Sequence, residues 1–116
     1  MEKVLEKLSN KDFAFRCIDL LDEHNVLEKS INVLTNKDLC SRYFRCSGFP
    51  VLSEVSYYGE PTRNDCYQGS RQRYYMEKIV CGKRAFVLTN HWYGPNKSMP
   101  DNRTPFQRWV LNQIGK

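Results

Sequence analysis

The hydrophobic pattern of this chain changes its period near residue 50, and this change limits the folds that the chain can adopt. Before Gly48, apolar side chains recur every three or four residues, as on the buried face of an amphipathic helix. After Pro50 they recur at every second position, as in a half-buried strand. Gly48 permits a left-handed helix end, and Pro50 disfavours helical backbone at Phe49. The sequence therefore predicts a helical part over residues 1–46 and a strand-rich part over residues 50–116.

The length of the chain is sufficient for one hydrophobic core. With 116 residues, it is too short for two domains of ordinary size, and we expect a single domain over residues 1–116. Apolar runs such as residues 85–88 are far shorter than a bilayer requires. We therefore expect a soluble protein that has no membrane partner.

Two or three helices are predicted in the first part. One runs from about residue 10 to residue 24, the apolar spacing then continues through Leu34, and another segment runs from about residue 36 to residue 44. Ser9 and Thr35 each stand three residues before an aspartate. Each is expected to cap a helix by accepting a hydrogen bond from an amide of the first turn.

About three antiparallel strands are predicted after residue 50. Alternating side chains mark a strand from residue 51, and residues 73–80 and 84–90 are expected to form a hairpin. Gly82-Lys83 supplies its two-residue turn, because glycine accepts a positive φ. The alternation does not indicate which hairpin face is buried. Residues 59–70 are rich in turn-forming and polar residues, which predicts a long exposed loop.

A final helix is predicted from a capping sequence near residue 104. Thr104 is expected to be the cap, Pro105 suits the first helical position, and Gln107 completes a capping box. Its apolar face is expected to pack on the sheet. The predicted fold class is therefore α+β: N-terminal helices, an antiparallel sheet and a C-terminal helix packed on it.

Basic and aromatic residues are concentrated in the second part of the chain. Between residues 40 and 116, twelve lysine and arginine side chains and five carboxylates give a net charge of +7. The first 39 residues carry six basic and eight acidic side chains, for a net charge of −2. Thirteen of the fifteen aromatic residues also follow residue 39. Basic groups neutralise phosphates and aromatic rings stack on bases, so this mixture predicts nucleic-acid binding by the second part.

The candidate binding residues lie on the loop, on the hairpin and at the start of the last helix. Their arginine and lysine side chains are expected to contact phosphates or base edges, and their tyrosine rings to stack on bases. The set comprises Arg63, Arg71, Arg73, Tyr74, Tyr75, Lys83, Arg84 and Arg103. Tyr57, Tyr58 and Lys97 extend the same basic and aromatic elements. The expected partner is DNA or RNA.

Two other interpretations fit the same composition. Tyrosine and arginine concentrate binding energy in protein interfaces, so the chain also suits a protein-interaction module, such as a small inhibitor or adaptor that docks on an acidic partner. A purely structural explanation exists as well. Tyrosine has a high strand propensity, and arginine keeps the edge of a sheet soluble.

No sequence motif indicates an enzyme, a metal site or a cofactor. A cysteine hydrolase using Cys81 and His91, or a small nuclease using His91 as general base with a nearby arginine, lacks the remaining groups that either reaction needs. The five cysteines contain no Cys-x-x-Cys pair, so we expect no bound metal. Their odd number leaves at least one thiol unpaired, which favours a reducing cytoplasm. We expect a non-catalytic protein without a cofactor.

Overall fold

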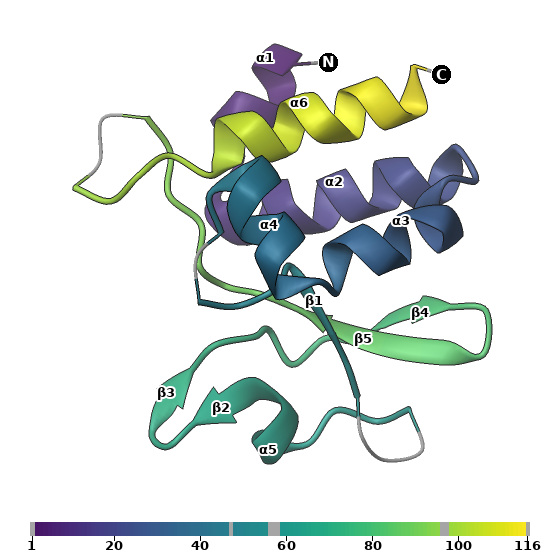
Figure 1. The fold of residues 1–116 in the computed structure, drawn as a ribbon, viewed down its shortest axis with the longest axis vertical. Coiled ribbons are helices and arrows are strands. Elements are labelled where there is room, and N and C mark those ends of the chain that lie inside the picture. Colours follow the sequence, from purple (N-terminus) through teal and green to yellow (C-terminus); the bar gives the residue numbers. More distant parts are fainter. Residues whose placement is uncertain (1, 47, 56–58, 96–97, 116) are drawn as a thin grey trace.

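The elements of the fold form layers on both sides of a small sheet (Figure 1). The computed structural model describes residues 2–46, 48–55, 59–95 and 98–115. The helices are α1 (Glu2–Lys7), α2 (Asn10–Glu23), α3 (Leu27–Leu34), α4 (Lys37–Phe44), α5 (Arg63–Cys66) and α6 (Arg103–Ile114). The strands are β1 (Leu52–Glu54), β2 (Tyr67–Gln68), β3 (Arg71–Gln72), β4 (Ile79–Cys81) and β5 (Arg84–Leu88).

Helices α2 and α4 begin at polar caps, one of which differs from the prediction. At α2, the Ser9 hydroxyl accepts a hydrogen bond from the Asp12 amide at 3.2 Å, as predicted. At α4, the cap is Asn36, whose side-chain oxygen accepts from the Leu39 amide at 3.0 Å. The predicted Thr35 cap is wrong because α3 extends through Leu34, which places Thr35 at the C-terminal end of that helix.

The sheet has the strand order β1-β5-β4, and both pairs of strands are antiparallel. The predicted hairpin turn at Gly82-Lys83 is confirmed, and Gly82 has a φ of 63°. The predicted strand over residues 73–80 is mostly absent, since β4 begins at Ile79. The segment before it is held by other contacts: an ion pair joins Glu77 to Lys11 of α2.

The predicted exposed loop over residues 59–70 contains regular structure. Thr62 and Asp65 form a reciprocal capping box at the start of α5. A turn at Gly69, which has a φ of 64°, then joins β2 to β3. The loop prediction is therefore wrong for this part, because short capping and turn sequences close a compact unit that polar composition alone does not reveal.

Strand β5 is buried on both of its faces. Phe86 and Leu88 belong to the main hydrophobic core with the helices, while Val87 belongs to a second cluster with Cys66 and Tyr74. The helices thus cover one face of the sheet, and the α5–β3 segment covers the other (Figure 1). Double burial explains why the alternation in the hairpin does not distinguish a core side from a solvent side.

Phe106 of α6 joins the helices to the segment that follows β5. Its ring centre lies 5.0 Å from that of Phe44, 4.9 Å from that of Trp92 and 6.3 Å from that of Phe13. Helix α6 makes its contacts with α2 and α4. The predicted Thr104 cap is wrong: the helix begins at Arg103, and the Thr104 amide donates to the carboxylate of Asp101 at 3.0 Å.

The predicted fold class is confirmed. N-terminal helices, a three-stranded antiparallel sheet and a C-terminal helix form an α+β fold. Within the described residues, α1 precedes the three helices expected from the sequence.

Replacing Phe106 with alanine should lower the free energy of unfolding by about 3–5 kcal/mol, because a fully buried ring with several aromatic neighbours leaves a cavity. Urea denaturation measures this change. Arg108→Ala, at an exposed position of the same helix, is the control and should stay within about 0.5 kcal/mol of the parent. Equal stability of the two variants would contradict this account of the core.

Candidate nucleic-acid interface

The predicted hairpin surface is divided between two ends of the molecule. Lys83 and Arg84 lie at the β4–β5 turn, whereas Arg71 lies on β3 at the opposite end of the sheet (Figure 1). The Arg84 guanidinium donates two hydrogen bonds to the Glu54 carboxylate, at 2.9 and 3.0 Å. This pairing neutralises much of the charge at the β4–β5 turn, so the turn is the weaker anion site.

A group of basic side chains gathers around Phe49. We call Arg45, Arg71, Arg73 and His91 the basic cluster. The Arg73 guanidinium lies 5.1 Å from the Phe49 ring centre, and its Nη1 donates to His91 Nε2 at 3.1 Å. Arg45 lines a cavity of about 60 Å³ together with Phe49 and His91. The cluster thus combines side chains from the end of α4, from β3 and from the segment after β5.

The hydrogen bond from Arg73 determines the protonation of His91. A guanidinium only donates, so Nε2 of His91 must carry a lone pair and the ring is neutral. Burial, and then the positive charges of Arg73 and Arg71, lower the pKa of His91 from its ordinary value of 6.5. This shift indicates that Arg71 and Arg73 create a positive potential at the ring.

Arg73 has an unsatisfied hydrogen-bond donor. Its Nε is buried and has no hydrogen-bond partner among the described residues. The ion pairs found within those residues are Lys11–Glu77, Arg16–Glu23, Lys78–Glu60 and Arg84–Glu54. None of them includes an arginine of the basic cluster. Positive charge is therefore left uncompensated in the basic cluster, and uncompensated positive charge attracts anions.

Asn102 holds the segment that carries His91. Its buried amide accepts a hydrogen bond from the Tyr93 amide at 2.8 Å and donates to the His91 carbonyl at 2.8 Å. The indole of Trp92, between them, donates to the Thr89 carbonyl at 2.7 Å. His91 therefore occupies a fixed position in the basic cluster.

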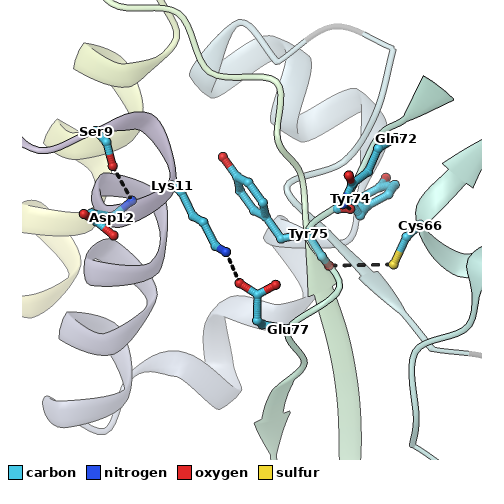
Figure 2. Close-up of polar contacts among 8 residues, drawn as sticks. All are labelled: Ser9, Lys11, Asp12, Cys66, Gln72, Tyr74, Tyr75 and Glu77. Carbon is cyan, nitrogen blue, oxygen red and sulfur yellow. Dashed lines mark hydrogen bonds and ion pairs between the residues drawn. The ribbon is translucent and has the colours of Figure 1, made fainter.

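The two tyrosines predicted to stack on bases point to opposite sides of their segment (Figure 2). Tyr74 is only 6% exposed, and burial raises its pKa to about 12. Tyr75 is half-buried, with its ring centre 5.5 Å from that of Phe15 and with the Lys11 ammonium 5.5 Å from its centre. Tyr74 is thus a core residue, and Tyr75 joins its segment to α2.

Arg63 and Arg103 have different environments. Arg63 is exposed on α5, with its guanidinium 4.2 Å from the Tyr67 ring centre. Tyr67 lines a cavity of about 200 Å³ with Arg73 and Phe49, so Arg63 borders the basic cluster. Arg103 is half-buried elsewhere and donates hydrogen bonds to the carbonyls of Leu5 and Leu8, at 3.1 and 2.9 Å. Arg103 therefore stabilises the fold by holding the end of α1.

Sequence reasoning did not place Arg45, Phe49 or His91 in the predicted binding surface, although the structure groups all three with Arg73. Arg45 follows α4 in the left-handed conformation, with a φ of 63°. The position of Arg45 near the end of a helix could have indicated it from the sequence. That the three residues lie close together follows only from the tertiary structure. The predicted residues Tyr57, Tyr58 and Lys97 lie outside the described residues.

The cysteines form no disulfide. All five side chains are unpaired, and burial raises the pKa of Cys17 and of Cys46 to about 12. Cys81 pairs with the first residue of β5, whereas His91 follows the end of that strand, so they do not form a catalytic pair. A search of the described residues finds no group of three or more potential metal ligands. Nor do those residues include a helix long and apolar enough to span a membrane.

Comparisons with models of known families, with curated proteins and with solved structures find no significant match. Function must therefore be argued from the geometry of the basic cluster.

Asn102→Ala should lower the free energy of unfolding by about 2–4 kcal/mol, because it leaves the Tyr93 amide and the His91 carbonyl without their partner. Urea denaturation is the measurement, with Asn112→Ala at an exposed position of α6 as the matched control. A loss as small as that of the control would show that Asn102 does not hold this segment.

The lowered pKa of His91 predicts a dependence of stability on pH. The unfolded state binds the proton more tightly, so His91 contributes stability above pH 6.5, and this contribution is lost as the pH falls through the lower pKa of the folded state. Urea denaturation measures the free energy of unfolding at about pH 7.5 and at about pH 5.5. The change in this free energy between the two pH values should be smaller for His91→Gln than for the parent. An identical difference in the two proteins would contradict the prediction.

Proposed function

We propose that this chain is a non-catalytic nucleic-acid-binding domain and that the basic cluster binds the phosphate backbone. The observation that carries the proposal is that none of the ion pairs found within the described residues includes Arg45, Arg71 or Arg73, so the basic cluster keeps its positive charge. The charge of a phosphate offsets the local positive potential.

The geometry of the basic cluster suits a single-stranded nucleic acid, whose backbone is flexible. The planar Arg73 guanidinium is already held by Phe49 and His91, so little side-chain freedom is lost when a phosphate or a base meets it. Bases of single strands stack on guanidinium planes as well as on aromatic rings. The exposed amide of Gln68 and the guanidinium of Arg63 lie along the same side and supply further polar contacts. We therefore favour a single strand over a duplex.

The cytoplasm is the compartment that fits this proposal. Five unpaired cysteines in a small domain suit a reducing environment, where disulfides do not form. Nucleic acid is accessible there without secretion.

A charge-matched pair of double variants tests the proposal. Arg71→Ala with Arg73→Ala should weaken binding of labelled single-stranded DNA or RNA by at least about tenfold and reduce the slope of log affinity against log salt by about 2. Lys83→Ala with Arg84→Ala removes the same charge at the β4–β5 turn and should change both quantities much less. Fluorescence anisotropy between about 50 mM and about 200 mM salt measures these effects.

Three outcomes of this titration are decisive. Absence of binding to any DNA or RNA at low salt would refute the proposed function. Equal losses in the two double variants would show that net charge, and not the basic cluster, drives binding. Capture of a protein that survives nuclease treatment, without any binding of nucleic acid, would support the protein-interaction module instead.

A further inference from the structure

A second and larger cavity lies on the other side of the segment held by Asn102. It has a volume of about 560 Å³, within the range of small-molecule sites. Its walls come from α1, α2, α6 and the segment that begins at Trp92. Trp92 is buried and fixed, and Tyr93 lines both this cavity and the small cavity that contains Arg45 and His91. Tyr93 therefore lies between the two cavities.

The Gln107 side chain is an unsatisfied polar group in this larger cavity. Gln107 is only 8% exposed, it lines the cavity, and its amide makes no hydrogen bond within the described part of the chain. A side-chain amide offers two donors and one acceptor, and these groups are open to a ligand in the cavity. A ligand that presents a donor beside an acceptor would satisfy the Gln107 amide.

The other polar side chains of the cavity either make hydrogen bonds within the protein or lie at the rim of the cavity. The Asn10 amide donates to the Trp92 carbonyl at 2.9 Å and accepts from Arg103 at 2.9 Å. Arg103 also donates to the backbone of α1. These two side chains form a rigid wall, while the exposed carboxylate of Glu6 adds an acceptor at the rim. Groups left to bind a ligand thus include the Gln107 amide, Glu6 and the Tyr93 side chain.

We propose that this cavity binds a nucleobase. A nucleobase has a flat apolar face and an edge on which donors and acceptors alternate, and a glutamine amide pairs with such an edge through two hydrogen bonds. The half-buried phenol ring of Tyr93 supplies apolar wall surface. The base comes from a free nucleotide or from a strand, and only the second source rests on the proposed function.

Gln107→Met tests the assignment, because methionine keeps the length of the side chain and removes its hydrogen bonds. Gln113→Met, two turns along α6 and outside this cavity, is the matched control. The ligands are the four nucleoside 5′-monophosphates and, as a probe without a base, ribose 5-phosphate. Calorimetry gives affinities, and the NMR signals of the Gln107 side-chain amide report contact directly.

We expect at least one nucleotide to shift the Gln107 amide signals, to bind more tightly than ribose 5-phosphate, and to lose at least about tenfold in affinity in Gln107→Met alone. The same variant should weaken binding of a short oligonucleotide that contains the preferred base if the base comes from a strand. Unshifted amide signals with every nucleotide and with the oligonucleotide would overturn the inference.

The two proposals fail separately. Oligonucleotide binding that depends on Arg71 and Arg73 but not on Gln107, with no nucleotide contact at Gln107, overturns the base site and leaves the proposed function intact. Nucleotide binding at Gln107 without any oligonucleotide binding supports the cavity as a site for free nucleotides and refutes the nucleic-acid proposal.

Discussion

The hydrogen bonds of one buried amide, that of Asn102, hold the segment that carries His91 and borders the larger cavity. The amide binds the His91 carbonyl and the Tyr93 amide, so three consecutive side chains are fixed in three environments. His91 enters the basic cluster, Trp92 enters the aromatic core, and Tyr93 borders the larger cavity. A short segment without regular secondary structure is thereby made rigid, and rigid positioning is what a recognition surface requires.

The distribution of ion pairs separates structural cations from available ones. Arg84 is engaged by Glu54, and Arg103 by the carbonyls of α1, so these side chains stabilise the surroundings of the sheet and the helices. Arg73 has an aromatic ring and a neutral imidazole as neighbours, which hold it without neutralising it. Counting positive charges in the sequence treats all these arginines alike. Their partners in the fold distinguish the arginines paired with a carboxylate or a backbone carbonyl from those in no ion pair among the described residues.

Much of the fold could be predicted because its signals are local. The Ser9 cap and the helical spacing of α2 depend on neighbours within a few residues, as does the Gly82-Lys83 turn. The errors arose where a contact distant in sequence decided the outcome. The expected strand before Ile79 is mostly absent where Glu77 pairs with Lys11, and Tyr74 turns into the second core cluster under α5. Predicting such contacts requires the positions of both partners.

By itself, the sequence determined the α+β class, the helix spacing, the hairpin turn and the excess of positive charge after residue 39, because each follows from periodicity, glycine conformation or composition. Only the tertiary structure decided which basic side chains act together. It brought Arg45 from the end of α4 beside His91, and it separated Arg71 from Lys83 by the length of the sheet. It also left the Gln107 amide facing a cavity. Proximity among distant residues is a property of packing, and no local pattern encodes it.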